Sequence, residues 1–311
     1  MRFPLRPFDA IPHFDFMAWR QFWVWSSAAM VVLTLVLLGF KGLNYGIDFT
    51  GGKLVQVQTE RALPVADVRA AVERAGFGGA SIQQYGAENE FLIRLPVEEA
   101  KVGEGATAGS DALLLAEIGK VAPAEIRRVE FVGPQVGQEL RVKGFTAMGV
   151  AIIAILIYVW LRFEMRYGLG AILALVHDVV LTMGVMSLLG TEMTLTVLAA
   201  LLTLIGYSLN DTIVIFDRIR ENRARYPNRP LDEVLNLSVN QTVARTIMTV
   251  STVMLVLFAL LIWGGEVIYD FALVLTIGTV LGTYSSVFVA SPVLLALEDY
   301  YQRMKKEGAT Q

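Results

Sequence analysis

The sequence contains no cysteine and only two histidines, His13 and His177. Without cysteine the chain forms no disulfide, has no thiol nucleophile and offers no thiolate to a metal. Charged residues are scarce, at 18% of 311 residues, and a net charge of -3 lacks the basic surplus that nucleic-acid binding requires. These shortages argue against a metalloenzyme, a redox cofactor held by thiolates and a nucleic-acid-binding protein.

Hydrophobic residues make up 55% of the sequence, which is too apolar for a soluble chain of this length. A helix crosses the hydrocarbon core with about 20 apolar residues. The stretches that meet this requirement are residues 22–40, 144–161, 169–189, 194–216, 246–263 and 268–297. No small-residue cleavage pattern follows the first stretch, so we expect it to be retained rather than cleaved as a signal peptide. The sequence predicts an α-helical membrane protein with six transmembrane helices.

Lys and Arg gather in alternate short segments, and basic segments stay on the cytoplasmic side of a membrane. They precede the first span, separate the second from the third, follow the fourth and close the chain, whereas Glu192 and Glu266 are the charges of the opposite short loops. This distribution places residues 1–21, 217–243 and 298–311 in the cytoplasm. Residues 41–141 are then extracytoplasmic.

Between the first two spans the apolar runs become short and alternating. The pattern predicts strands over 53–59, 80–85, 89–95 and 126–132, with helices over 64–75 and 111–120. This β-α-β-β-α-β order is that of an α+β ferredoxin-like domain. No histidine or cysteine accompanies the carboxylates of the segment, so we interpret it as an interaction domain, with a Gly-rich loop at 102–110.

Ionisable side chains inside a span cost at least about 2.5 kcal/mol, so those present usually pair or line an ion path. Asp211 lies inside the fourth predicted span, and Arg245 opens the fifth. Asp211 is either a structural carboxylate held by Asn, Thr or Arg, or a carrier of protons or cations. Arg245 is either a boundary residue that extends to the interface or the counter-charge of Asp211. Burial favours the neutral carboxyl and a nearby guanidinium favours the charged form, so such a site can exchange an ion.

His177 and Asp178 lie in the third span, in the same half of the membrane as Asp211. A histidine on a helix face is often simply packed, so these two residues are either structural or part of one polar layer with Asp211. Small residues recur every fourth position of the sixth span, at Gly278, Gly282, Ser286 and Ala290. Such a stripe permits close helix packing, against either this chain or a partner.

Several motifs carry a resemblance to a known family. They are Gly46-Ile47-Asp48-Phe49-Thr50-Gly51-Gly52 after the first span, Val176-His177-Asp178-Val179 in the third, Ser208-Leu209-Asn210-Asp211-Thr212-Ile213-Val214 running to Asp217-Arg218-Ile219-Arg220-Glu221-Asn222, and Asn240-Gln241-Thr242 with Arg245-Thr246. In sequence and order, residues 44–297 resemble the SecF branch of the SecD/SecF protein-export family, within the resistance-nodulation-division superfamily.

The resemblance implies an accessory subunit of the bacterial Sec translocase that uses the ion-motive force to promote late preprotein export across the inner membrane. It implies SecD and the SecYEG channel as partners, with YajC and YidC as further ones, and protons or sodium ions as the coupling ion. Transporters of this superfamily have two six-helix halves, so a chain with one half needs a partner half, and the small-residue stripe is a candidate for that contact.

By residue, the resemblance implies an ion path at Asp211 and Arg245, with Asn210 and Thr212 beside them and His177 and Asp178 as accessory groups. Those six residues, with Gly46, Asp48, Gly51 and Gly52 of the motif after the first span, are the candidate site.

Two rival functions remain open on the sequence alone. One is half of a small-molecule exporter, which needs an apolar pocket in its external domain. The other is a passive assembly scaffold without ion flux. An enzyme is the least favoured class, because Gly76-Phe77-Gly78-Gly79 lacks the Lys and the strand-to-helix context of a phosphate-binding loop.

Overall fold

The structure is a computed structural model that describes residues 14–96, 107–162 and 165–308. Its contacts divide the chain into two compact units. The helical unit comprises Met1–Leu43, Met148–Thr191 and Thr196–Gln311, and the sheet unit comprises Asn44–Ala147 and Glu192–Leu195. The expected N-terminal segment 1–21 and loop 102–110 fall largely outside the described residues.

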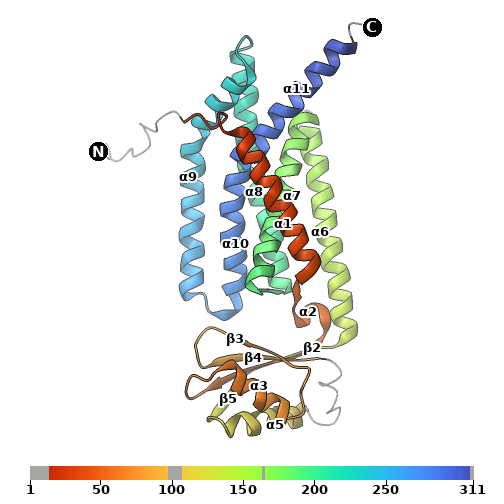
Figure 1. Ribbon diagram of the computed structural model, residues 1–311, viewed down its shortest axis with the longest axis vertical. Coiled ribbons are helices and arrows are strands. Elements are labelled where there is room, and N and C mark those ends of the chain that lie inside the picture. The colour runs from red at the N-terminus through yellow and green to blue at the C-terminus, as the bar shows by residue number, and fades with distance from the viewer. Residues whose placement is uncertain (1–13, 97–106, 163–164, 309–311) are drawn as a thin grey trace, which may run out of the picture. The chain divides into compact units, whose positions relative to one another are not determined.

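The sheet unit is built around a four-stranded antiparallel sheet in the order β3-β4-β2-β5. Two helices, α3 and α5, lie on one side of this sheet (Figure 1). Its elements are β1 (Asn44–Tyr45), α2 (Ile47–Thr50), β2 (Gly52–Thr59), α3 (Val65–Arg74), β3 (Ser81–Gln84), β4 (Glu90–Leu95), α5 (Thr107–Gly119), β5 (Ala124–Val132) and β6 (Glu192–Met193). This chain order and strand order confirm the predicted ferredoxin-like domain.

Alternating side chains explain why this sheet has one buried face. Along β2, Val55 and Val57 are completely buried, and along β4, Phe91 and Ile93 are completely buried, whereas their neighbours in each strand are partly exposed. The buried residues pack against Leu114 and other residues of the two helices in one hydrophobic core. Successive strand residues point to opposite faces, so the period-two pattern specifies which face receives α3 and α5.

The helical unit contains the long apolar helices, and six segments of the described chain are long and apolar enough to cross a membrane. This finding confirms the predicted fold class. The elements are α1 (Arg20–Lys41), α6 (Pro134–Arg162), α7 (Met165–Leu189), α8 (Leu195–Arg225), α9 (Leu231–Trp263), α10 (Glu266–Ser285), the π-helical turn η1 (Ser286–Ala290) and α11 (Ser291–Gly308).

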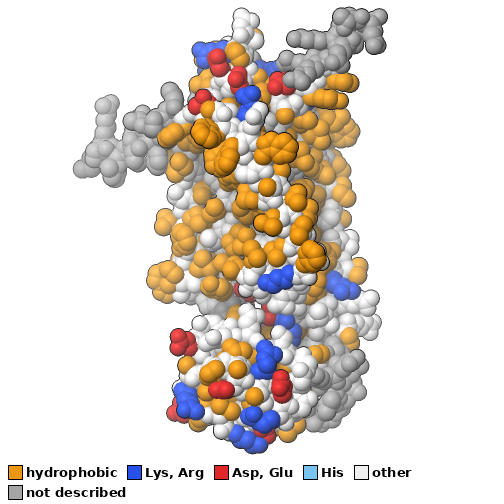
Figure 2. Space-filling view, viewed as in Figure 1, with side chains coloured by type: hydrophobic (Ala, Val, Ile, Leu, Met, Phe, Trp, Pro, Cys, Tyr) orange, Lys and Arg blue, Asp and Glu red, His pale blue; other side chains and the backbone are white. Residues whose placement is uncertain are grey.

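Burial separates inner from outer helices within this unit. In the most apolar windows of α7, α8 and the α10–α11 segment, 56% of the residues are buried, against 6% in α1 and α6 and 11% in α9. Figure 2 shows the visible side of the helical unit covered mainly by hydrophobic side chains, with charged side chains gathered at the end where α8 meets α9. Only lipid or a protein partner is a suitable neighbour for the exposed apolar faces of the outer helices.

Two features of the helices differ from the sequence-based expectation. The stretch 217–243, expected as a loop, is mostly helix, because α8 continues to Arg225 and α9 begins at Leu231. The sixth span, expected as one helix, is interrupted by η1. Pro292 follows this turn and has no N–H for the carbonyl of Phe288, so a regular α-helical bond is missing there. Local π-helical adjustments are one way in which membrane helices satisfy the backbone groups that a proline leaves free.

The small-residue stripe of the sixth span packs inside this chain. A Cβ added at Gly278 would lie 2.5 Å from the Cδ atoms of Leu204, and one added at Gly282 would lie 3.0 Å from Cβ of Ser208. Both neighbours belong to α8, and Ala290 at the other end of the stripe is buried. The expectation that this stripe serves the contact with a partner half is therefore wrong, because α8 of the same chain occupies it.

Candidate functional site

Asp178 is the centre of a buried hydrogen-bonded cluster that joins three helices. Its side chain on α7 is completely buried, and its Oδ2 accepts hydrogen bonds from Ser208 of α8 at 2.5 Å and from Ser285 of α10 at 2.7 Å. Its Oδ1 lies 2.9 Å from Nδ1 of His177. A buried carboxylate satisfied from three sides is held in place, so its arrangement favours a structural role.

His177 continues this cluster toward α1. Its ring stacks on Tyr284 with ring centres 6.0 Å apart, and the Tyr284 hydroxyl lies 2.8 Å from Oγ of Ser27. Nε2 of His177 is buried and has no hydrogen-bond partner among the described residues. The histidine therefore orients Asp178 through its Nδ1.

Asp211 is a further buried carboxylate of the helical unit, and its environment is the opposite of that of Asp178. Its side chain on α8 is 4% exposed, and its Oδ2 is buried without a hydrogen-bond partner in the described part of the chain. Leaving a charged oxygen unsatisfied in an apolar interior is costly, so such a group favours a state in which it holds a proton or another cation.

Arg245 supplies the opposite charge. It lies on α9 and attracts Asp211 electrostatically, although no direct ion pair joins the two among the described residues. Its side chain is exposed in the isolated chain. Tyr207, one turn before Asp211, lies near both Asp211 and Thr249 of α9. Asp211 and Arg245 thus attract each other from neighbouring helices, with no direct ion pair between them among the described residues.

The structure separates the two residues that flank Asp211 in the sequence. Thr212 is 1% exposed, and its hydroxyl donates to the Ser208 carbonyl at 3.4 Å. Asn210 lies on the exposed side of α8. Only one of the flanking residues therefore belongs to the buried layer, because adjacent positions of a helix point in different directions.

The predicted residues thus form two groups that share α8. One group contains His177 and Asp178, and the other contains Asp211 and Arg245. Ser208 belongs to the first group and lies one turn before Asp211. Sequence reasoning did not select Ser285 and Tyr284, because serine and tyrosine are common inside apolar helices and give no signal of their own. Tyr284 contacts Ser27 of α1 and His177 of α7, and Ser285 donates to Asp178 of α7.

A second polar cluster lies near the ends of α7, α8 and α11 and was not predicted. Glu298 is 4% exposed and forms ion pairs with Arg166 of α7 and with Arg223 of α8, the latter at 2.7 Å. Asn222 precedes Arg223 in the chain; it is completely buried and donates to Ser238 of α9 at 2.9 Å. These bonds fix one end of α8 against its neighbours.

The glycine motif after α1 has a defined backbone role. Gly51 and Gly52 have φ angles of 71° and 127°, a region that side chains other than glycine rarely adopt. A Cβ at Gly52 would lie 2.6 Å from the Leu95 carbonyl oxygen, and one at Gly46 would lie 3.0 Å from Cγ2 of Thr194. The motif therefore forms a tight turn, through the short helix α2, against β4 and the segment before α8.

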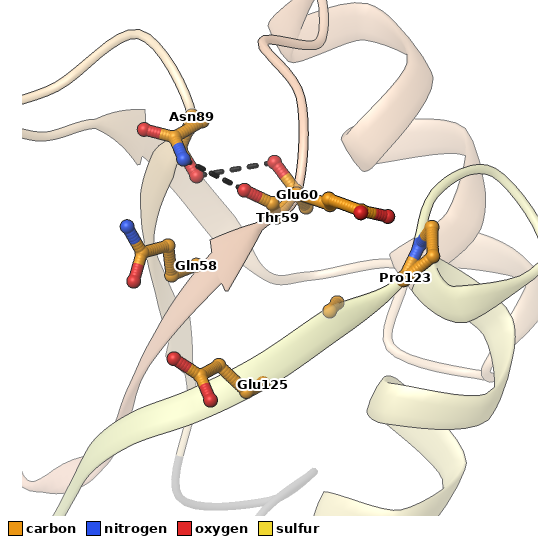
Figure 3. Close-up of a pocket in the computed structure, with 7 residues that line it drawn as sticks. Gln58, Thr59, Glu60, Asn89, Pro123 and Glu125 are labelled. Atoms are coloured by element: carbon orange, nitrogen blue, oxygen red, sulfur yellow. Dashed lines mark hydrogen bonds between the residues drawn. The ribbon is translucent and has the colours of Figure 1, made fainter.

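One pocket of the sheet unit is polar and open. It has a volume of about 500 Å³ and lies where β2 ends and β5 begins (Figure 3). Asn89 donates to the Thr59 carbonyl at 2.7 Å on its wall, and Thr59 N–H donates back to Asn89 at 2.8 Å. Its remaining polar lining comes from Gln58, Glu60 and Glu125. Such a lining does not provide the apolar pocket that a small-molecule exporter requires.

Together, six apolar helices and ionisable side chains buried among them define a multi-pass membrane protein of the transport class. Two family descriptions match the chain. "SecD/SecF GG Motif" covers residues 36–62, and "Protein export membrane protein SecD/SecF, C-terminal" covers residues 114–300. The chain belongs to the SecF family of protein translocase subunits.

Curated relatives agree with this assignment. The protein translocase subunit SecF of Magnetococcus marinus is 48% identical, with 92% of each chain covered. That of Escherichia coli O157:H7 is 38% identical, with 96% of this chain and 94% of the relative covered. The solved structure of SecDF from Thermus thermophilus is 38% identical with a TM-score of 0.84, and it matches 95% of this chain. The match covers only 40% of that longer solved chain.

Proposed function

We propose that this chain is the SecF half of an ion-driven accessory complex that promotes late steps of preprotein export through SecYEG. SecD supplies the other half, YajC and YidC are further partners, and the complex lies in the bacterial inner membrane with both termini of this chain in the cytoplasm. Export work comes from ion flow, so the chain itself is not an enzyme. The observation that carries this proposal is the unsatisfied buried carboxylate of Asp211 beside Arg245.

The partner half has support in the faces that this chain leaves open. The solved SecDF chain is more than twice as long as the part that this chain matches. On α8 and α9, Asn210 and Arg245 are exposed although both lie within helices apolar enough to span a membrane. Polar groups at membrane depth require a protein or aqueous neighbour. A second six-helix half packed against α8 and α9 supplies such a neighbour.

The mechanism follows from the charge balance at Asp211. With Asp211 ionised, Arg245 attracts it and holds α9 to α8. An arriving proton or sodium ion neutralises the carboxylate, removes this attraction and lets the helices shift. Each charge that crosses 100 mV supplies about 2.3 kcal/mol, which is enough to change the balance between two helix arrangements by more than tenfold. The sheet domain is then moved by the helices and biases an emerging preprotein outward.

Asp211→Asn tests this function in the complete complex, reconstituted with SecD and SecYEG. We expect gradient-driven export and ion flux to be lost while assembly is retained. Asp217→Asn is the matched control, because it makes the same change on the same helix at a residue that pairs with Arg162 at the surface. Gradient-driven export by the Asp211 variant at the wild-type level would refute the proposal. Export without any ion flux in the wild type would favour a passive scaffold.

A further inference from the structure

The segment that leads into α8, together with the first residue of this helix, belongs to the sheet unit rather than to the helical unit. The segment Glu192–Leu195 clusters with the sheet unit, and Leu195 is the first residue of α8. Strand β6 in this segment pairs in parallel with β1, through Asn44 with Glu192 and Tyr45 with Met193. The chain that leads into α8 is therefore bound to the chain that leads into the sheet.

An ion pair reinforces this short strand pairing. Arg94 of β4 pairs with Glu192 of β6, and their side chains are only 13% and 14% exposed. Burial lowers the pKa of Arg94, which reflects how far the guanidinium is withdrawn from water. It remains charged, because its ordinary pKa is far above neutrality. Arg94 lies between Ile93 and Leu95, which point into the core, so it occupies the opposite face of the sheet.

Asp48 of the glycine motif makes a second link to the same segment. Its Oδ2 accepts a hydrogen bond at 2.8 Å from the backbone N–H of Leu195, which is among the unsatisfied N–H groups at the start of α8. A carboxylate at a helix N-terminus is also favoured by the helix dipole. The Gly46 N–H donates to the Met193 carbonyl at 2.9 Å, so the motif contacts the segment on both sides of Thr194.

We propose that Arg94, Glu192 and Asp48 form a joint that makes the start of α8 move together with the sheet domain, and so carries the effect of ion binding to that domain. The inference rests on the proposed function. Asp211 lies on the same continuous helix, so a displacement of α8 reaches the joint without crossing a loop. These three are positioning residues: they hold the helix start and do not bind the ion.

The absence of native cysteine permits a direct test of the joint. In the double variant Asn44→Cys/Glu192→Cys, the change at Glu192 removes the ion pair with Arg94, and the two cysteines stand at positions that are paired across β1 and β6. Neighbouring strands are about 4.8 Å apart, within the range a disulfide spans. In the complete complex, we expect the reduced variant to lose gradient-driven export while ion flux through Asp211 persists. Oxidation of the same sample restores export, because a covalent bond from β6 to β1 then holds β6 in the sheet unit in place of the ion pair from β6 to β4.

The charge-reversed variant Arg94→Glu/Glu192→Arg gives an independent measurement if the cysteine variant folds poorly. Export by this variant above that of Arg94→Glu alone supports the joint. Full export by the reduced cysteine variant, or an oxidised variant that assembles but remains as inactive as the reduced one, would overturn it.

Failure of the joint and failure of the proposed function give different results. If the joint alone is wrong, Asp211→Asn still abolishes gradient-driven export while the cysteine variant exports normally in both redox states. If the function is wrong, wild-type export does not respond to the ion gradient at all.

Discussion

The buried carboxylates of Asp178 and Asp211 should respond to substitution in opposite ways. Asp178→Ala removes three hydrogen bonds, to His177, Ser208 and Ser285. Hydrogen bonds between membrane helices contribute about 0.6 kcal/mol on average and up to about 1.7 kcal/mol, so three of them give a loss of about 2–5 kcal/mol. Asp211→Asn removes the charge of a carboxylate whose Oδ2 has no hydrogen-bond partner in the described residues. The free energy of unfolding of this variant should therefore not fall.

The assay is unfolding of the purified chain in mixed micelles with increasing fractions of SDS, followed by circular dichroism. We expect the midpoint to fall for Asp178→Ala and to stay at or above the wild-type value for Asp211→Asn. Asp178→Asn is the intermediate case, because an amide keeps the shape but offers a single acceptor oxygen in place of two. Export measured on the same variants should follow the reverse order, with Asp211→Asn the most affected among the folded proteins.

Two results would refute this reasoning. An unchanged midpoint for Asp178→Ala would mean that the three hydrogen bonds contribute nothing to stability and that Asp178 has another role. A large loss of stability for Asp211→Asn would mean that the helices need the charge of Asp211 to stay folded, so that neutralisation by an ion would unfold them rather than shift them. Asp211 would then be a structural residue, and the ion-driven mechanism would lose its carrier.

Further predictions concern packing and the ends of the helices. Gly278→Ala places a Cβ 2.5 Å from a side chain of α8 and should lower the free energy of unfolding by about 1–3 kcal/mol; Gly149→Ala, with open space around it, should not lower it in the same SDS titration. Glu298→Gln leaves two arginines without their shared carboxylate and should lower the free energy of unfolding by about 2 kcal/mol. The loss is smaller than for a fully buried ion pair because the arginines are partly exposed. Asn240→Ala removes both bonds that hold the backbone of Phe14, so its amide should exchange hydrogen roughly tenfold faster by mass spectrometry.

The elements of the fold were predictable where one residue pattern is enough to specify them. Strand β2 was expected at 53–59 and is found at Gly52–Thr59, because alternating apolar residues define a half-buried strand. Helix α9 was expected to begin at residue 246 and begins at Leu231. A search for apolar stretches finds the part of a helix in lipid and misses its polar extension into water. Pro230 followed by Asp232 and Glu233 is the start signal that marks the true N-terminus.

The candidate site was predictable only in part, for a related reason. Asp211, His177 and Asp178 are conspicuous because ionisable groups are rare in apolar helices. Ser285 and Arg94 gave no such signal, since a serine in a span costs little and an arginine in a strand is ordinary. Their partners lie far away along the chain: Ser285 binds Asp178, and Arg94 binds Glu192. Contacts of this kind depend on the tertiary fold, which neither periodicity nor composition encodes.

Asp178 has hydrogen-bond partners on neighbouring helices and Asp211 Oδ2 has none in the described residues, and this difference indicates which helix contact ion binding changes first. Asp178 ties α7, α8 and α10 together through bonds that do not depend on Asp211, and Gly278 brings α10 into close contact with α8. Asp211 and Arg245 interact across α8 and α9 by charge alone. Neutralising Asp211 therefore weakens the contact between α8 and α9 and leaves the three inner helices bound. The first movement should be between α9 and this inner group, while α8 keeps its links at both ends, to Glu298 through Arg223 and to Asp48 through Leu195.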